Sequence, residues 1–187
     1  MSDGNDDPRL IGGPERREIV IAEHDPAWPG RYEALARAIR AALGDTLLRI
    51  EHVGSTSVPG LAAKPVVDIL ALVPDSADES SYVPRLAAIG YELRVREPDF
   101  FEHRMLRTPA RDVHLHVYSP SAAAETGRLV AFRDRLRASG EDRARYEAVK
   151  RRLASQPWPD MNAYADAKSE VVESIIAAAL ADDREND

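Results

Sequence analysis

The hydrophobic positions of the chain repeat with a helical period near its start and again over its final third. From Pro29 to Leu43, apolar residues recur every three or four positions, with proline in the first turn and Gly44 placed to end the helix. A second helix is predicted near Ser80–Ile89, ending at Gly90. After the last predicted strand the chain is expected to be helical, with apolar stripes at Leu129/Phe132/Leu136, Tyr146/Val149/Leu153 and Tyr164/Lys168/Val171/Ile175.

Alternating or continuous apolar runs between these regions predict β-strands. The most apolar run, Val66–Val73, contains a single charge, Asp68, and its near-continuous hydrophobicity indicates burial on both faces. Because most strands precede most helices, the pattern favours the α+β class over a doubly wound α/β fold. The predicted strands are Glu18–Glu23, Leu47–Val53, Val66–Val73, Tyr91–Arg96, Phe100–Arg107 and Val113–Tyr118.

Composition predicts one domain with a short tail at each end. Gly, Asp, Pro and charged residues dominate residues 1–17, and the chain closes with DDREND, so residues 1–17 and 182–187 are expected to be disordered and residues 18–181 to form the domain. The net charge is −7, of which −2 lies in residues 1–18 and −3 in residues 182–187. The folded part is therefore nearly neutral, and it lacks the one-sided basic excess typical of a nucleic-acid-binding protein.

Several classes of protein are excluded by what the sequence lacks. With no cysteine, the chain has no disulfide framework, no thiolate nucleophile and no cysteine-based metal site. No apolar run is long enough to cross a membrane, and the first residues do not resemble a secretory signal, so a cytoplasmic protein with no membrane partner is expected. Any metal ion would have to be held by His, Asp or Glu.

The segment from Glu51 to Leu70 contains the strongest candidate chemistry. After a predicted strand, Gly54, Ser55 and Thr56 offer backbone N–H groups and hydroxyls that could surround phosphate oxygens, and Lys64 adds a positive charge. Asp68, inside an apolar strand, must be paired, hydrogen-bonded or metal-bound to offset its desolvation. The alternative is purely structural: the hydroxyls shape a turn, and the aspartate pairs with the lysine or with an arginine.

These residues carry a resemblance to a known family. The segment contains neither GxxxxGK[ST] nor GxGxxG. The run HVGSTSVPGLAAKPVVDI, with HLHV at 114–117, FRDRLR at 132–137, YEAVK at 146–150 and the late Tyr164 and Lys168, resembles the GrpB family, a branch of the nucleotidyltransferase-fold superfamily, over residues 19–180. The resemblance implies a small mixed β-sheet with helices packed against it, a C-terminal helical segment, and a cleft where Gly54 and Ser55 face Asp68.

The sequence departs from the superfamily at the metal site. The resemblance implies two divalent ions, normally Mg²⁺, held by paired acids that bridge a nucleoside triphosphate, yet Val66 and Leu70 stand where the second carboxylate would be. His114 and His116 project from one face of a predicted strand and would converge on Asp68 if the strands are neighbours. Two imidazoles with one carboxylate suit Zn²⁺, Mn²⁺ or Fe²⁺ better than Mg²⁺. Alternatively, both histidines are neutral and hydrogen-bonded, or they contact substrate directly.

Further candidates come from the rest of the chain. His103 is a candidate extra ligand or general base, although an exposed strand position is the favoured alternative. Arg133, Lys150 and Lys168 are candidate phosphate contacts, of which the GrpB resemblance supports Arg133 and Lys168. Long cations commonly cover apolar surface with their stems instead.

Three functions fit these residues. The first is a metal-dependent transferase that moves a nucleotidyl group from a nucleoside triphosphate to a small acceptor. In it Gly54, Ser55 and Thr56 hold phosphate, Lys64 or Arg133 balances charge, and Asp68 positions the metal with His114 and His116. The second is a non-catalytic module that binds a nucleotide or coenzyme A precursor, since GrpB-type domains resemble appendages of dephospho-coenzyme A kinases. The third is a His/Asp metal-dependent hydrolase.

Overall fold

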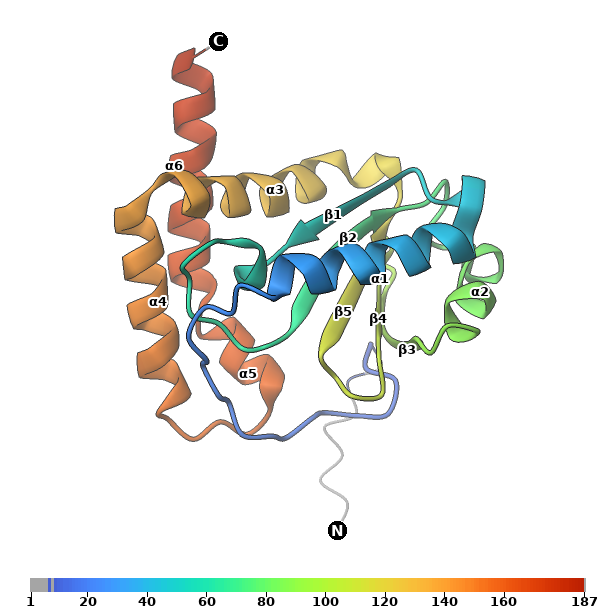
Figure 1. Cartoon of the computed structure of the whole chain (residues 1–187), viewed down its shortest axis with the longest axis horizontal. Helices are drawn as coiled ribbons and strands as arrows, with labels where there is room; N and C mark the ends of the chain where they lie inside the picture. The colour runs from blue at the N-terminus through green and yellow to red at the C-terminus, as the bar shows by residue number, and fades with distance from the viewer. Residues whose placement is uncertain (1–6, 8, 187) are drawn as a thin grey trace.

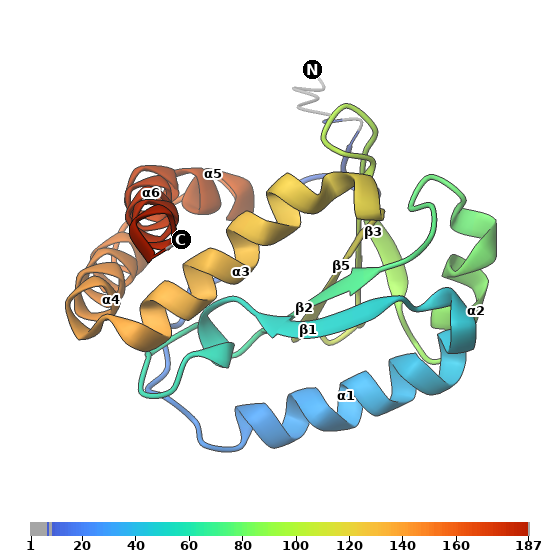
Figure 2. The same ribbon diagram turned by 90° about the horizontal axis from the view of Figure 1, so that it is seen from above.

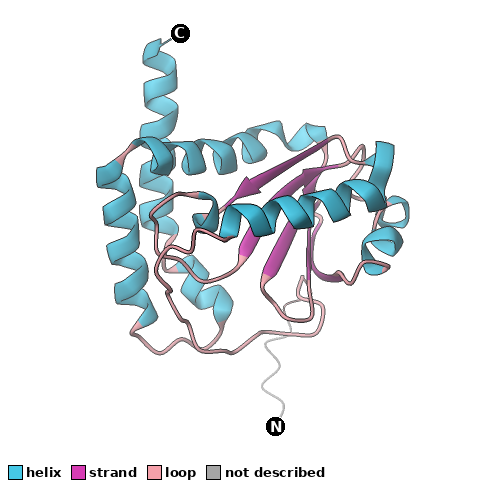
Figure 3. Ribbon diagram, in the orientation of Figure 1, coloured by secondary structure: helices cyan, strands magenta, loops and turns pink. Residues whose placement is uncertain are grey.

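The structure of the chain is a computed structural model that describes residues 7 and 9–186, with the side chains of residues 183–186 excepted. One mixed sheet forms its centre, with helices on both faces (Figures 1 and 3). The elements in chain order are α1 (Trp28–Leu43), β1 (Arg49–Val53), β2 (Val67–Leu72), α2 (Val83–Ala87), β3 (Glu92–Glu97), β4 (His103–Arg107), β5 (Val113–Tyr118), α3 (Ala123–Ala138), α4 (Gly140–Ala154), α5 (Met161–Asp166) and α6 (Ser169–Asn186).

The sheet has the strand order β1-β2-β5-β4-β3, in which β2 and β5 are parallel and every other pair is antiparallel. The α+β class and the mixed sheet predicted from the sequence are confirmed. β2 lies inside the sheet between β1 and β5, which explains why its sequence is apolar on both faces.

The two faces of the sheet bury different sets of side chains. Figure 2 shows α1 on one face and α3 on the other. Ile39 of α1 packs in one core cluster with Ile69 of β2 and Leu115 of β5, all fully buried. On the opposite side, α3 packs against α4 and α6, and Phe132, Leu136 and further helical residues form a second core cluster. The helices α4, α5 and α6 stand beside the end of the sheet where β1 finishes (Figure 1).

The predicted first strand is wrong. Of Glu18–Glu23, Ala22 alone pairs with another segment, in an isolated bridge to Ala63, and Figure 3 draws these residues as loop. The alternating pattern was misleading because the segment runs over the surface, where Val20 is 54% exposed. The predicted helix at Ser80–Ile89 is shorter than expected: α2 covers five residues and follows a 3₁₀ turn at Glu79–Ser81.

Described residues of both predicted tails contact the domain or continue its last helix. Leu10 forms a bridge to Val95 at the edge of the sheet, and the guanidinium of the buried Arg94 donates to the carbonyls of Ile11 and Gly13. The disorder of residues 1–17 stays a prediction from composition, whereas the edge strand β3 supplies backbone partners to residues 9–11, which a polar sequence does not reveal. At the other end, α6 continues to Asn186, so the predicted tail at 182–187 is helical over the residues described. None of the described helices combines the length and apolarity needed to cross a membrane.

We expect Leu115→Ala to lower the free energy of unfolding by about 2–5 kcal/mol, because it opens a cavity between the sheet and α1. Leu48→Ala, at a position 53% exposed, is the matched control and should change it by less than about 0.5 kcal/mol. Urea denaturation of the three proteins measures both values. Equal effects of the two substitutions would contradict the assignment of the core.

Candidate functional site

A cavity of about 620 Å³ lies over the sheet face opposite α1. Its floor crosses the sheet from the end of β1 to the edge strand β3, and its other walls come from α3, α4, the α5–α6 region and the first described residues. The lining residues used below are Gly54, Ser55, Lys64, Asp68, Glu97, His103, His114, His116, Tyr146, Lys150, Tyr164 and Lys168. Most of the residues singled out by the sequence analysis therefore meet in one place.

Asp68, His114 and His116 form a compact group, called here the Asp-His-His group. The parallel pairing of β2 and β5 sets Asp68 directly beside His114. The Oδ1 atom of Asp68 lies 3.2 Å from His114 Nδ1 and 3.8 Å from His116 Nε2, and the three donor atoms all lie within 4.8 Å of one another. The convergence predicted from the spacing of the two histidines is therefore present in the structure.

The chemistry of this group fits a single divalent ion. Bonds of about 2.0–2.2 Å around a tetrahedral ion put neighbouring donor atoms about 3.4 Å apart, close to the separations found here. Burial alone would raise the pKa of the Asp68 carboxyl, but the interaction with His114 and His116 outweighs it and holds that pKa well below its usual range. The carboxylate is therefore ionised and able to act as a ligand.

Gly54 brings the loop after β1 directly against Asp68. Its φ is +68°, in the left-handed region that glycine adopts easily, and a Cβ atom at this position would lie 2.8 Å from Asp68 Cβ and closer still to the carboxylate. The next residue, Ser55, accepts a hydrogen bond at 3.1 Å from Lys150 Nζ. A residue other than glycine would have to displace the aspartate.

Three lysines, called here the lysine cluster (Lys64, Lys150 and Lys168), line the cavity together. The Nζ atoms of Lys64 and Lys168 lie 5.6 Å and 4.6 Å from the ring centre of Tyr164, and Lys150 Nζ lies 4.7 Å from that of Tyr146. Tyr164 is 1% exposed, and among the described residues its hydroxyl has no hydrogen-bond partner. The cluster is a concentration of positive charge beside the Asp-His-His group.

Burial disfavours the charged forms of all three lysines in the lysine cluster. Burial, with repulsion from Lys168 as the next cause, lowers the pKa of Lys64 to about 8 and that of Lys150 to about 7. Burial also lowers the pKa of Lys168, although the charge of Asp68 acts in the opposite direction. An anionic ligand would favour the charged form of all three side chains.

Two residues predicted to bind substrate do not line the cavity. Thr56 is buried, and its Oγ1 donates to the carbonyl of Val66 at 3.1 Å and lies 3.0 Å from His52 Nε2, so it fixes the loop, as the structural alternative proposed. The guanidinium of Arg133 pairs with Glu51 and Asp134 and donates to the carbonyl of His52. Its charge is already balanced by these two carboxylates. The position of Arg133 next to Phe132 in a helical stripe could not indicate these partners.

The structure also brings His103 and Lys150 to the site. His103 is 7% exposed, not a surface position, and it contacts both His116 and Glu97. Lys150 lies on the apolar stripe of α4 between Tyr146 and Leu153. A compositional signal was available for the lysine cluster: the chain has 25 basic residues, of which only three are lysines, and all three line this cavity. Arginine serves every other basic position.

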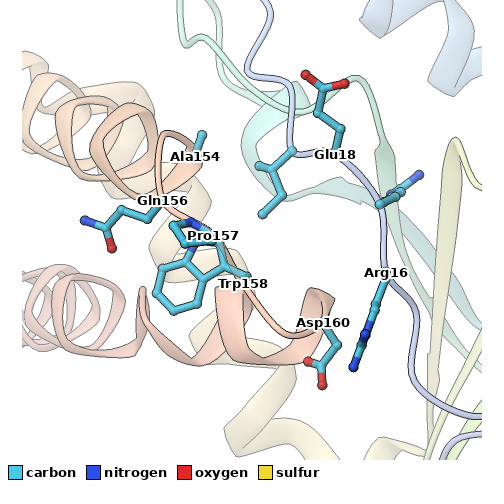
Figure 4. Close-up of a pocket in the computed structure, with 9 residues that line it drawn as sticks. Arg16, Glu18, Ala154, Gln156, Pro157, Trp158 and Asp160 are labelled. Atoms are coloured by element: carbon cyan, nitrogen blue, oxygen red, sulfur yellow. The ribbon is translucent and has the colours of Figure 1, made fainter.

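A second cavity of about 200 Å³ lies away from this site, where the N-terminal segment meets the end of α4. Figure 4 shows Pro157 and Trp158 on one side of it and Arg16 and Glu18 on the other. The carboxylate of Asp160 is occupied in capping α5, and the indole N–H of Trp158 donates to the carbonyl of Leu153. We assign no chemistry to this cavity.

Comparison with known proteins gives the family. The model of the GrpB protein family matches residues 18–178. The chain belongs to the GrpB family. It is 51% identical over 168 residues to the UPF0157 protein BH1888 of Halalkalibacterium halodurans, covering 90% of this chain and 86% of that protein. It is 54% identical over 170 residues to the UPF0157 protein SCO7215 of Streptomyces coelicolor, covering 91% and 89%.

A solved GrpB structure supports the fold. The crystal structure of conserved protein GrpB from Enterococcus faecalis matches with a TM-score of 0.79 and 32% identity, over 87% of this chain and 98% of that one. Cid1 in complex with its short product ApU matches at a TM-score of 0.42 and 13% identity, over 62% of this chain and 39% of that one, which is too distant to support an inference. The dephospho-CoA kinase of Mycolicibacterium paratuberculosis is 29% identical over 179 residues, covering 82% of this chain and 44% of that protein.

We expect Gly54→Ala to destabilise this GrpB family member more than Gly60→Ala. Both glycines have a positive φ, so each substitution adds backbone strain of about 1–3 kcal/mol. Only the first also places a methyl group against Asp68, because nothing lies within 4 Å of a Cβ atom at Gly60. Thermal unfolding of the two variants measures the difference, and an equal loss of stability would contradict the close approach of the loop to Asp68.

Proposed function

We propose that this protein is a metal-dependent transferase that moves a nucleotidyl group from a nucleoside triphosphate to a small acceptor. One observation carries the proposal: a group suited to a divalent ion and a cluster of three lysines line the same cavity. A metal–triphosphate complex has the matching charge distribution, because its phosphates are anionic on both sides of the ion. The volume of about 620 Å³ is within the range of small-molecule sites.

Each part of the site has a role in this reaction. Asp68, His114 and His116 would hold the ion, which acts as a Lewis acid on a phosphate oxygen. The backbone of Gly54 and the hydroxyl of Ser55 lie where phosphate oxygens would approach the Asp-His-His group. The hydroxyl oxygen of the acceptor would form a bond to the α-phosphorus while the bond to pyrophosphate breaks, and the hydroxyl proton would pass to solvent. The lysine cluster would neutralise the negative charge of the departing pyrophosphate.

The composition of the Asp-His-His group favours one ion over two. Two adjacent divalent ions need several anionic oxygens to bridge them. The residues two positions before and two positions after Asp68, Val66 and Leu70, are apolar and buried, so neither supplies a second carboxylate. Imidazole nitrogens also favour Mn²⁺, Fe²⁺ or Zn²⁺ over Mg²⁺. We therefore propose a single-ion site with a preference for these metals.

The use of lysine at this cavity supports a role in handling phosphate charge. The ammonium group of lysine is a compact charge whose pKa shifts readily on burial, whereas the guanidinium of arginine stays charged. The chain has 22 arginines and only three lysines, and all three lysines line one cavity. This distribution favours a site whose charge adjusts to its ligand.

A binding module for a nucleotide or coenzyme A precursor is the second candidate. The absence of a second carboxylate beside Asp68 favours it, and so does the likeness to a relative named dephospho-CoA kinase, of which this chain matches 44%. Such a protein would use the same cavity without transferring a group. A hydrolase would instead direct an activated water to the same phosphorus.

We expect purified protein to consume a nucleoside triphosphate in the presence of Mn²⁺ and to release pyrophosphate, and Asp68→Asn to lower the rate at least about 100-fold by weakening the metal site. Asp45→Asn, an exposed aspartate outside the cavity, is the matched control and should leave the rate unchanged. Chromatography with each of the four triphosphates measures consumption and identifies the products.

The outcomes of that assay separate the three functions. Nucleotide attached to an added acceptor supports the transferase, and nucleoside monophosphate released in its absence supports the hydrolase. A rise in melting temperature with a triphosphate, a coenzyme A precursor or a metal, without turnover, supports the binding module. Neither binding nor turnover with any of these ligands would contradict the proposal.

We expect pyrophosphate binding at pH 8 to be accompanied by uptake of up to about 1.4 protons. The reason is that Lys64 and Lys150, with pKa values near 8 and 7, are partly neutral at this pH, and an anion raises both values. Affinity should consequently fall as the pH rises above 8, where the lysines must gain protons to bind. Titration calorimetry in two buffers of different ionisation enthalpy measures the uptake.

Two substitutions make the proton measurement specific. Lys64→Arg keeps the charge but cannot release its proton, so pyrophosphate should still bind with a smaller proton uptake. Arg37→Lys, at an exposed position of α1, should leave the uptake unchanged. Uptake that is the same in the wild-type protein and the Lys64→Arg variant would show that Lys64 is not part of the anion site.

A further inference from the structure

A chain of hydrogen bonds runs from the Asp-His-His group to the edge of the sheet. The Nδ1 atom of His116 lies 3.1 Å from Nε2 of His103, and Nδ1 of His103 lies 2.7 Å from Oε2 of Glu97. Three strands contribute one residue each, because Glu97 and His103 are register partners on β3 and β4 and His116 is on the adjacent strand β5. These two contacts connect the cavity floor from its metal-ligand end to its outer edge.

The direction of each hydrogen bond follows from the group at the outer end. An ionised carboxylate accepts hydrogen bonds and cannot donate them, so Nδ1 of His103 must carry the proton that it shares with Glu97. In a neutral ring this leaves Nε2 of His103 as an acceptor, and it must receive the proton of His116 Nδ1. When the His116 ring carries a single proton, its Nε2 atom is then left with a free lone pair, and this atom lies 3.8 Å from Asp68 Oδ1, beyond hydrogen-bond distance.

We propose that Glu97 and His103 are positioning residues that fix the tautomer of His116, so that its Nε2 presents a lone pair to a metal ion beside Asp68. The metal part of this inference rests on the function proposed above; the tautomer part does not. The opposite tautomer would point an N–H group at the metal position and would prevent His116 from acting as a ligand.

Packing of the His103 ring holds the hydrogen-bonded residues Glu97, His103 and His116 in this arrangement. His103 is 7% exposed and stacks on His116 with ring centres 5.3 Å apart and on Tyr118 with ring centres 4.7 Å apart. Both nitrogens of His103 are occupied by Glu97 and His116, and among the described residues the metal-ligand group is Asp68, His114 and His116. His103 is therefore placed to orient a ligand and not to be one.

The tautomers can be read directly by NMR of the metal-free protein. Two-dimensional ¹H–¹⁵N spectra of the imidazole rings at pH 8 distinguish Nδ1–H from Nε2–H in each histidine. We expect the Nδ1–H form for both His103 and His116 in the wild-type protein. Observation of His116 mainly as Nε2–H would overturn the proposal, whatever the protein does with metals or nucleotides.

Glu97→Gln is the sharpest variant, because the amide it introduces has the same shape but can donate as well as accept. If the amide donates a hydrogen bond to Nδ1 of His103, then Nε2 of His103 can carry the proton and donate it to Nδ1 of His116, which reverses the direction of both hydrogen bonds. We expect the single tautomer of His116 to become a mixture. Glu102→Gln changes a neighbouring carboxylate that pairs with Arg104 and takes no part in the hydrogen bonds from Glu97 to His116, so it should leave the spectrum unchanged.

Metal affinity tests the consequence at the Asp-His-His group. We expect Glu97→Gln to weaken Mn²⁺ and Zn²⁺ binding about 10–100-fold in calorimetry, and His103→Phe, which keeps a stacked ring but removes the acceptor, to do the same. Glu102→Gln should bind like the wild-type protein. The visible spectrum of bound Co²⁺ should change in the two variants of the chain, because the geometry of His116 changes, and should not change in the control.

The results separate this inference from the proposed function. If the wild-type protein binds a divalent ion and Glu97→Gln keeps both the tautomer and the affinity, the positioning role is wrong while the metal site stands. If the tautomers respond as expected but no divalent ion binds the wild-type protein, the proposed metal-dependent function is wrong and His116 is fixed for another ligand. Circular dichroism of each variant confirms that it is folded.

Discussion

The site depends on how one carboxylate is held within a buried strand. Asp68 occupies the middle of the sheet, where an unpaired charge would be strongly destabilising. The parallel pairing of β2 with β5 supplies two imidazoles to it, and the glycine conformation at Gly54 lets the preceding loop close over it without a side chain in between. Loss of the strand pairing would remove the two imidazoles from Asp68, and a side chain in place of Gly54 would push the loop away from the carboxylate.

The same pairing explains why the cavity has two chemically different parts. The strands β2 and β5 bring the acid and the two histidines to one face of the sheet. Lys150 of α4 and Lys168, in the turn between α5 and α6, lie over that face. Lys64 reaches the same place from the loop before β2. Charges of opposite sign thus meet in one cavity although they come from segments separated by up to a hundred residues of chain.

Much of this site could be predicted from local sequence, and the limits have physical causes. The period-two spacing of His114 and His116 and the lone charge at Asp68 are local signals, and the structure brings these residues together as expected. Glu97 and His103 could not be placed, because their role depends on which strands pair. Arg133 and Thr56 have the right chemistry for phosphate, but tertiary partners, Glu51 for one and the Val66 carbonyl for the other, already satisfy them. The contacts of Ile11 and Gly13 are made with Arg94, far along the chain, so composition alone could not indicate them.

The charges of the site also indicate how metal and anion would affect one another. An ion at the Asp-His-His group adds positive charge opposite a lysine cluster whose pKa values are already lowered by burial and mutual repulsion, so metal alone would depress them further. An anion alone would be repelled by the carboxylate of Asp68. A metal–phosphate complex carries a cation and an anion together. Its anion offsets the repulsion between the ion and the lysine cluster, and its ion offsets the repulsion between the anion and Asp68. Metal and anion should therefore bind with positive coupling, and by linkage each raises the affinity of the other by the same factor.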